Sequence, residues 1–328
     1  MKIAFQTNQL SLRGTEVAIY DYAHFNETLL GNESIILVKR KHHFPHDKPA
    51  VEKFEKRFKV FYYDSWNHAE DILLSNNVDI LYTLKAGGKD EVESKNIKTC
   101  VHAVFQEFDP HGDVYAYISK WLSSVMTEGK SPYVDFMVYL PEVEGDLRKE
   151  LDIPKDAIVF GRHGGHDTFS IPFAINVVNK IVKERDDIYF LFLNTQKSRL
   201  IKHKQIIHLP ATSDLELKTK FINSCDAMLH ARINGESFGL AIAEFSIRNK
   251  PVITWTGKDV QKYYPHKHDL AHLELLGDKG IYYNDEPELK DILLNFTPQP
   301  DKDWDTYSKT YNPETIMNKF KEVFLDDK

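Results

Sequence analysis

Two glutamates in the stretch 225–255 are the residues whose types and spacing best suggest chemistry. Glu236 stands just before an apolar run, Gly239 lies near the start of that run, and Glu244 lies within it. If the run is a helix, the two carboxylates are at most about 12 Å apart along its axis, at 1.5 Å of rise per residue. The free N–H groups of its first turn and the positive end of its dipole form an anion site. A sugar, a pyrophosphate and a ribose in a row have a similar length.

The elements that must position these residues form a βαβ unit, which implies a parallel sheet. We expect a strand at 226–230, a loop closing on Gly235, a helix at 237–248, a stop at Pro251 and a strand at 252–255. The helix has almost no polar face, so it should be buried nearly all round. Because an unpaired buried charge is costly, Glu244 needs either a ligand or a protein donor beside it.

The residues E-S-F-G-L-A-I-A-E, which begin at Glu236, and the P-V-I after the helix resemble the E-x7-E signature of retaining glycosyltransferases of family 4. The resemblance implies the GT-B fold, an α/β architecture in which two Rossmann-like domains face across a cleft. It implies that Glu236 contacts the transferred sugar and Glu244 the ribose hydroxyls, while the backbone amides of Phe238, Gly239 and Leu240 hold the phosphates. In the alternative reading, Glu236 only stands at a helix N-terminus and Glu244 pairs with a core arginine.

A second group of candidates follows the strand expected at 157–160, which runs directly into Gly161-Arg162. In the family this dipeptide ends the first strand of the donor domain and its arginine faces the diphosphate, so the resemblance assigns that role to Arg162. Gly164 and Gly165 then permit close approach of the backbone to a ligand.

The chain departs from the family at the position of a second cation. Where the family commonly has a lysine shortly after the arginine, this chain has Asp167. A diphosphate beside two carboxylates needs positive charge, and one arginine with a helix dipole supplies little of it. Lys197, in the loop after the strand expected at 188–194, is our predicted replacement. Arg199 and Arg232 are the alternatives.

The first half of the chain offers weaker candidates. Gly14 lies between the first expected strand and helix, where such folds admit a ligand phosphate, and a simple tight turn explains it equally well. The family has a glycine-bearing loop here that faces the donor. By the same resemblance, His102 is an acceptor-side contact near the reacting sugar, and a hydrogen-bonded core histidine is the alternative. Asp109, His111 and Asp113 in the next loop are either acceptor contacts or turn formers.

Composition narrows the class of protein. The 328 residues suit two domains, and 42% hydrophobic residues can build cores. A net charge of −7 argues against nucleic acid as the main partner. The sequence holds only two cysteines, which favours a reducing compartment, and no signal-like or membrane-spanning apolar run. We therefore expect a cytoplasmic protein whose membrane contact is at most peripheral. The basic residues at 39–48 have two possible roles. They form a solvated loop, or they contact an anionic acceptor or a lipid surface.

The order of expected elements divides the chain into three parts. These are an acceptor-side Rossmann-like domain at 1–140, a nucleotide-sugar-binding one at 141–305, and a helix at 306–328 that returns to the first domain, as the resemblance implies. In the first domain we expect strands at 2–5, 34–39, 60–63, 78–84, 98–105 and 114–118, helices at 15–30 and 66–75, and a helix capped by Ser119. In the second we expect helices at 143–151, 171–185, 215–223 and 286–294, with strands at 206–209 and 281–283 besides those above.

One segment matches the letters of a metal-binding motif but not its usual position after a strand. Asp303-Trp304-Asp305 matches D-x-D, but it lies in a polar segment that no strand precedes. We therefore predict no metal and no other cofactor.

The resemblance to family 4 implies an enzyme that moves a sugar from a nucleotide-diphosphate donor to a hydroxyl of a glycan or another acceptor, with retention of anomeric configuration. Two alternatives remain at this point. The first is a sugar-nucleotide epimerase or hydrolase on the same fold. The second is a sensor that binds the donor without turning it over, because the expected lysine is missing.

Overall fold

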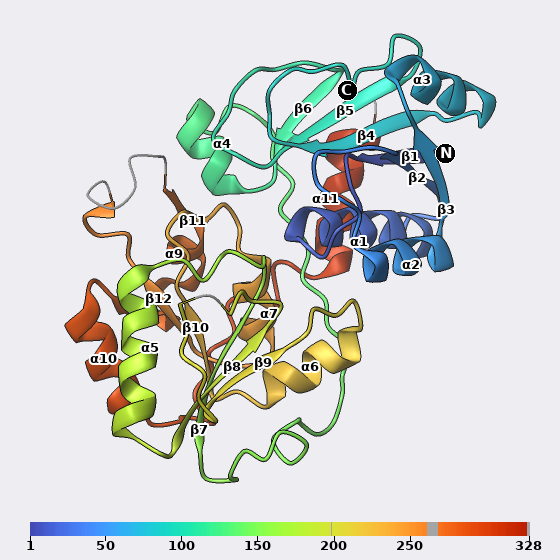
Figure 1. Cartoon of the computed structure of the whole chain (residues 1–328). Coiled ribbons are helices and arrows are strands. Elements are labelled where there is room, and N and C mark those ends of the chain that lie inside the picture. The colour runs from blue at the N-terminus through green and yellow to red at the C-terminus, as the bar shows by residue number, and fades with distance from the viewer. Residues whose placement is uncertain (198, 261–267, 327–328) are drawn as a thin grey trace. The chain divides into compact units, whose positions relative to one another are not determined.

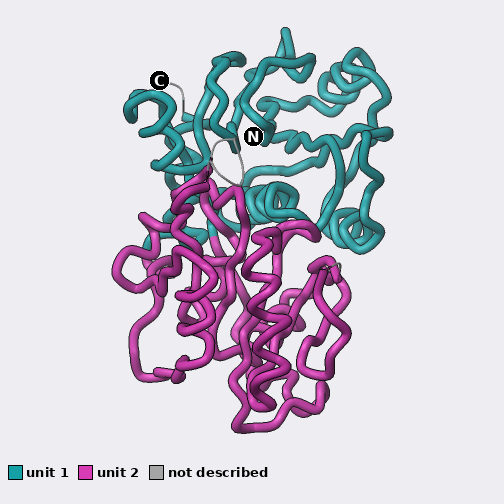
Figure 2. The backbone as a smooth tube through the Cα atoms, turned by 60° about the vertical axis from the view of Figure 1, so that its left-hand side comes forward, with its two compact units in different colours: residues 1–137, 310–328 teal, residues 138–309 magenta. Residues whose placement is uncertain are grey.

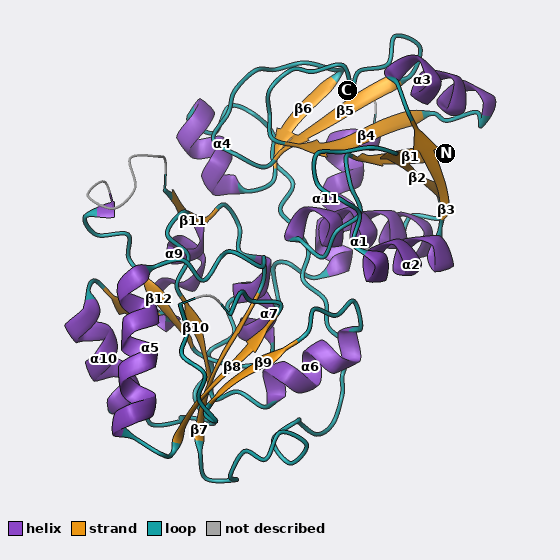
Figure 3. Ribbon diagram, in the orientation of Figure 1, coloured by secondary structure: helices purple, strands orange, loops and turns teal. Residues whose placement is uncertain are grey.

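The computed structural model describes residues 1–197, 199–260 and 268–326. The chain divides into two compact units, Met1–Met137 with Thr310–Lys328, and Val138–Lys309 (Figure 2). Each unit is built on its own six-stranded sheet, in which all neighbouring strands are parallel. Helices cover both faces of each sheet (Figure 3).

The sheet of the first unit has the strand order β3-β2-β1-β4-β5-β6, which is the order of a dinucleotide-binding fold. Its strands are β1 (Lys2–Thr7), β2 (Glu33–Lys39), β3 (Lys59–Tyr63), β4 (Ile80–Lys85), β5 (Lys98–Ala103) and β6 (Val114–Tyr117). Its helices are α1 (Gly14–Thr28), α2 (Lys48–Arg57), α3 (Trp66–Ser75), α4 (Lys120–Thr127) and α11 (Pro313–Phe320), the last continued by the π-helical turn Lys321–Leu325.

The two faces of this sheet bury different helices (Figure 1). On one face, Ala69 and Leu73 of α3 belong to a cluster with Ala4 and Leu81 of the sheet. On the other face, the ring of Phe320 in α11 lies 5.1 Å from that of Tyr22 in α1 and 5.2 Å from that of Tyr82 in β4. The C-terminal helix is therefore part of the core of the first unit.

The second unit repeats the same order with β7 as its first strand, giving β14-β12-β10-β7-β8-β9. Its strands are β7 (Ile158–His163), β8 (Ile188–Leu193), β9 (Ile206–Leu209), β10 (Ala227–His230), β12 (Val252–Trp255) and β14 (Ile281–Tyr283). Its helices are α5 (Pro172–Glu184), α6 (Leu215–Asn223), α7 (Leu240–Ile247), α9 (Ala271–Leu276) and α10 (Glu286–Leu294). A small separate pair, β11 (Gly235–Glu236) and β13 (Asp269–Leu270), lies beside this sheet.

Three helix predictions differ from the structure, each for a local reason. No helix forms at 143–151, because Gly145 has φ +83° and the Asn223 side chain binds the carbonyls of Val143 and Gly145. Helix α7 starts at Leu240 rather than at 237, because Gly239 is left-handed at φ +89°. Helix α1 starts at Gly14 and has Arg13, not Thr15, at its N-cap.

Helix α2 was not predicted at all. It buries only Ala50 and Phe54. An apolar stripe this narrow gives no clear helical periodicity in a charged segment. The predicted cap of α4 is confirmed, since the Ser119 side chain accepts a hydrogen bond from the Leu122 amide. Within the described ranges, no helix is both long and apolar enough to cross a membrane.

Candidate functional site

The strongest site in the second unit lies where its strand order reverses, between β7 and β10. Open α/β sheets bind ligands outside the carboxyl ends of their strands at such a point. Arg162 is near the carboxyl end of β7, and His230 is the last residue of β10. Glu236 follows in β11, so three elements bring charged and polar side chains to one place.

Arg162 is a buried cation with unused donors. It is 1% exposed, and its Nη2 donates to the Thr168 hydroxyl. Its Nε and Nη1 find no partner among the described residues. Burial lowers the pKa of this guanidinium to about 10, so it stays charged at neutral pH. Gly164, at φ +140°, makes room for it, because a Cβ there would lie 2.6 Å from Nη1. A buried arginine with two donor nitrogens that have no partner among the described residues is suited to receive an anion.

Both oxygens of Glu236 are held by protein donors. Arg232 Nη1 lies 2.6 Å from Oε2, and His230 Nε2 lies 3.2 Å from Oε1. Burial works to raise the pKa of Glu236, but the guanidinium of Arg232 and the imidazole of His230 hold it well below its usual range. Glu236 is therefore a carboxylate in a fixed orientation, with its side chain 16% exposed.

The turn between Glu236 and α7 presents free backbone amides. Phe238 is 1% exposed, and its carbonyl accepts a hydrogen bond from the Tyr307 hydroxyl at 3.3 Å, which anchors the turn. Gly239 occupies the left-handed region, which other residues adopt only with strain. The half-buried Leu240 then opens α7, and the first amides of that helix are free of intrahelical bonds.

Glu244 is buried within α7, as the apolar run predicted. Its Oε1 pairs with Lys218 of α6 at 2.8 Å, and its Oε2 with His163 at 3.0 Å. Burial works to raise the pKa of Glu244, but the ammonium of Lys218 and the imidazole of His163 lower it to about 2. The charge thus has protein donors, a lysine and a histidine in place of the core arginine of the alternative reading.

The structure places Arg232, and not Lys197, next to Glu236. Lys197 is exposed, and the neighbour whose pKa it affects is His208. Arg199 is also exposed, in a left-handed conformation. Arg232 pairs with Glu236, and Asp167 is among the carboxylates that raise its pKa. Asp167, where the resemblance led us to expect a lysine, is therefore electrostatically coupled to an arginine from the loop after β10.

His102 is a core residue, which corrects its predicted role as an acceptor contact. It is 0% exposed on β5. Its Nδ1 lies 2.6 Å from the Tyr82 hydroxyl, and its Nε2 lies 2.8 Å from the Val134 carbonyl. Burial lowers its pKa to about 3, so the ring is neutral and its polar atoms are satisfied within the first unit.

We expect the His102→Gln variant to lose about 1–3 kcal/mol of stability, because the buried hydrogen bonds of the imidazole are lost. Its turnover per folded molecule should equal that of the wild type, because His102 contacts no ligand in the proposed mechanism. The wild-type unfolded chain binds a proton at this histidine below about pH 6.5, whereas the folded chain does so only near pH 3. The stability from this group is therefore lost as the pH falls through that window, and the variant should show a flatter pH dependence there. Urea unfolding at several pH values measures this, and a specific loss of turnover would restore the acceptor role.

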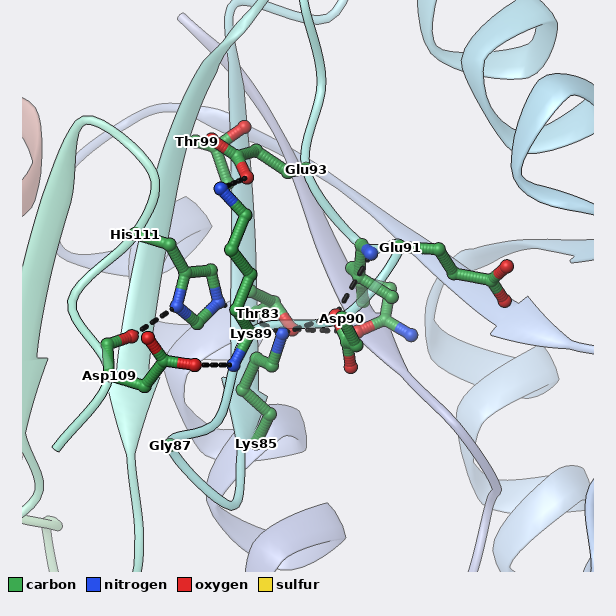
Figure 4. Close-up of polar contacts among 12 residues, drawn as sticks. Thr83, Lys85, Gly87, Lys89, Asp90, Glu91, Glu93, Thr99, Asp109 and His111 are labelled. Atoms are coloured by element: carbon green, nitrogen blue, oxygen red, sulfur yellow. Dashed lines mark hydrogen bonds and ion pairs between the residues drawn. The ribbon is translucent and has the colours of Figure 1, made fainter. Parts of the chain in front are cut away.

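The loops that follow β4 and β5 in the first unit are tied together by a buried lysine (Figure 4). Lys85, at the end of β4, is 9% exposed; it pairs with Asp90, and its Nζ lies 3.0 Å from His111 Nε2. The other ring nitrogen of His111 lies 2.6 Å from the Asp109 carbonyl, and the Asp109 carboxylate accepts from the Lys89 amide. These contacts order the loops at the strand-order reversal of this unit.

The remaining candidates have local roles or exposed positions. Gly14 is exposed at the start of α1, and Gly165 stands close to Thr168, which holds Arg162. The Asp113 carboxylate accepts a hydrogen bond from the Thr99 amide. In the D-x-D segment, Asp303 pairs with Lys279, and Asp305 accepts bonds from the amides of Tyr307 and Ser308. Over the described ranges, no group of three or more possible metal ligands comes together.

Sequence reasoning missed three residues of the site, Lys218, His163 and His230. Lys218 lies on an amphipathic helix where charge is ordinary, and His163 and His230 each end an apolar strand, which gave no sign that they face a glutamate. Arg232 was only an alternative, although its spacing from Glu236 offered a usable signal.

Neither a protein-family model nor a curated protein sequence matches the chain. Solved structures do match. Alr3699/HepE of Anabaena, solved in complex with UDP-glucose, superposes with a TM-score of 0.71 at 14% identity over 98% of both chains. WaaG, a glycosyltransferase involved in lipopolysaccharide biosynthesis, gives 0.68 at 10% identity over 99% of this chain and 100% of its own. The fold is GT-B. A putative UDP-N-acetylglucosamine 2-epimerase from Listeria monocytogenes also matches, with a TM-score of 0.61 at 12% identity over 99% of this chain and 96% of its own. GT-B architecture alone therefore does not select the reaction.

Proposed function

We propose that this protein is a retaining glycosyltransferase that uses a nucleotide-diphosphate sugar, most simply a UDP-sugar, and that its second unit binds the donor. The observation that carries the proposal is the arrangement around the Gly239 turn. Arg162 presents unused donors there, Glu236 is a fixed carboxylate, and Glu244 lies farther along the same helix. The resemblance to family 4 and the UDP-glucose complex of the similar Anabaena protein agree with this arrangement.

The proposed roles follow from charge. Arg162 and the first amides of α7 bind the diphosphate, and Arg232 supplies the second cation near the reacting bond. During transfer, the bond between the anomeric carbon and the diphosphate oxygen breaks on the face where the acceptor oxygen attaches. The departing phosphate takes the acceptor proton, so no separate base is needed. Glu236 contacts the sugar and stabilises positive charge that develops on it. The first unit is proposed to bind the acceptor.

A donor screen tests the proposal directly. We expect UDP-sugars to raise the thermal midpoint more than GDP- or ADP-sugars, because a ligand bound only by the folded state stabilises it by mass action. Transfer would be supported if UDP is released only when an acceptor is added. Retention would be supported if NMR shows the same anomeric configuration in the product as in the donor. Binding without any turnover would identify a sensor instead.

The similarity to the Listeria epimerase makes an epimerase the second candidate. Such an enzyme would consume UDP-N-acetylglucosamine without an acceptor. NMR of the sugar after incubation with the protein alone distinguishes the two, because only an epimerase changes the configuration at C2.

The Glu244→Gln variant is expected to bind the donor about 10- to 150-fold more weakly, because a charged acceptor of the ribose hydroxyls is worth about 1.5–3 kcal/mol. Calorimetry with the best donor of the screen measures this affinity. Circular dichroism must show that the variant is folded, since Lys218 and His163 also lose their charged partner. Equal donor affinity in both proteins would contradict the ribose role.

Turnover is expected to survive a chelator. Arg162 and Arg232 are proposed to balance the diphosphate charge, a task that a divalent ion performs in other transferases. The measurement is turnover after treatment with EDTA. Its loss, followed by recovery with Mn²⁺ or Mg²⁺ alone, would contradict the expectation and return Asp303 and Asp305 to consideration.

A further inference from the structure

Three hydrogen bonds converge on His230 at the end of β10. Its Nε2 lies 3.2 Å from Glu236 Oε1, and its Nδ1 lies 2.8 Å from Thr254 Oγ1. Its backbone carbonyl accepts a hydrogen bond from the Tyr283 hydroxyl at 2.8 Å. Thr254 belongs to β12 and Tyr283 to β14. Two further strands of the sheet therefore fix both the main chain and the ring of this histidine.

The proton positions in this chain have one consistent assignment. Glu236 is ionised, since Arg232 and His230 hold its pKa well below its usual range against the effect of burial, so its oxygens only accept. Burial, together with the charges of Arg162 and Arg232, lowers the pKa of His230 against the opposing effect of the Glu236 carboxylate, so we assign a single proton to this ring. That proton must be on Nε2, facing Glu236. The Nδ1 atom is then an acceptor, and the Thr254 hydroxyl must donate to it.

We propose that His230 is a positioning residue for Glu236, and that Thr254, by donating to Nδ1, fixes the orientation of the imidazole that holds this carboxylate toward the donor sugar. The His230 side chain is 2% exposed and Thr254 is 0% exposed, so both act through Glu236. Arg232 holds the other carboxylate oxygen from a different direction. The carboxylate is thereby fixed against rotation, with its remaining lone pairs directed to a ligand. The proposal rests on the proposed contact of Glu236 with the sugar, and adds what orients it.

A second buried imidazole packs beside His230. The ring of His272, on α9, lies 5.1 Å from that of His230 and is 0% exposed. Neither of its ring nitrogens has a hydrogen-bond partner within the part of the chain that the structure describes. Burial and the nearby His230 hold the pKa of His272 well below its usual value.

The tautomer can be observed without any activity. In ¹⁵N NMR of the wild-type protein at neutral pH, we expect the Nε2 of His230 to appear protonated and the Nδ1 unprotonated, with the signal assigned by its loss in the His230→Gln variant. In the Thr254→Val variant the hydroxyl donor is gone while the side-chain shape is kept, so Nδ1 should stay unprotonated and its ¹⁵N signal should move downfield because it no longer accepts a hydrogen bond. A proton on Nδ1 in the wild type would overturn the proposal.

Kinetics test the consequence. With UDP-glucose as the probe donor, Thr254→Val should lower kcat about tenfold or more and change KM for the donor little, because orientation of Glu236 and not binding area is lost. Thr254→Ser keeps the hydroxyl and should restore turnover. The matched control is Thr99→Val, which removes the hydroxyl of another fully buried strand threonine, in the first unit. Unchanged kcat in Thr254→Val would overturn the proposal.

The experiments separate failure of this inference from failure of the proposed function. A wild-type protein that never turns over a sugar nucleotide contradicts the function, whereas the NMR result still decides the tautomer. If Thr254→Val does not fold, the wild-type tautomer and the activities of Thr254→Ser and Thr254→Ala test the proposal. A serine variant that is as inactive as the alanine variant would contradict the role of the hydroxyl.

Discussion

The Arg162→Met variant is expected to lose turnover by at least about 10²-fold and to unfold at a higher temperature than the wild type. Turnover falls because one charge partner of the departing diphosphate is removed. Stability rises by about 1–3 kcal/mol because the wild type buries a cation whose Nε and Nη1 have no partner among the described residues. Methionine fills a similar volume without charge. A binding residue kept at a cost to the fold should show these two effects together.

The control for this variant is Arg148→Met in the same unit. Arg148 pairs with Asp226 at 2.8 Å and donates to the carbonyls of Ser224, Lys155 and Ala157, so its donors are used within the protein. Its replacement should cost about 3 kcal/mol and leave turnover per folded molecule unchanged. Thermal unfolding with and without donor, together with kcat, measures both variants. If Arg162→Met is destabilised and fully active, Arg162 is a structural residue.

The second large effect is expected for Arg232→Met, with a loss of turnover of about 10²-fold. A diphosphate brings about two negative charges, and Arg162 with the dipole of α7 supplies one full charge and roughly half of another. Arg232 is the cation that the structure adds at Glu236, at 2.6 Å from Oε2. Its removal also leaves that oxygen with one donor fewer, so the carboxylate is less well oriented.

Lys197→Met is the matched control, because it removes one positive charge from an exposed side chain of the same unit. Its turnover should stay within about twofold of the wild type, since exposed charges interact weakly through solvent. The measurement is kcat at saturating donor for both variants, with Arg232→Lys to test whether charge alone suffices. If kcat falls strongly in Lys197→Met and stays at the wild-type value in Arg232→Met, the second cation is Lys197. If kcat is unchanged in both variants, the charge-balance argument is contradicted.

Hydrophobic periodicity predicted the individual elements, and the resemblance to family 4 implied their GT-B arrangement. Most of the strands and helices were predicted within a few residues, because parallel strands buried on both faces are continuous apolar runs and their helices carry clear apolar stripes. The spacing of Glu236, Gly239 and Glu244 also indicated the place at which we propose that a diphosphate sugar binds. The prediction was wrong where backbone conformation overrode composition: Gly145 prevents a helix at 143–151, and Gly239 delays the start of α7.

Only the tertiary structure decided which side chains complete the site. The sequence gives residue types, but the partner of a buried charge depends on which strand ends and loops lie side by side. Strand order brings the ends of β7 and β10 together, so Arg162 and His230 lie near Glu236, and Arg232 reaches that carboxylate from the loop between β10 and β11. The same packing buries His102 among Tyr82 and backbone carbonyls, where a strand-end histidine had suggested a ligand contact. Pairing between side chains distant in sequence is set by the three-dimensional arrangement of the elements, because a charge removed from water needs whichever partner the fold brings within hydrogen-bond distance.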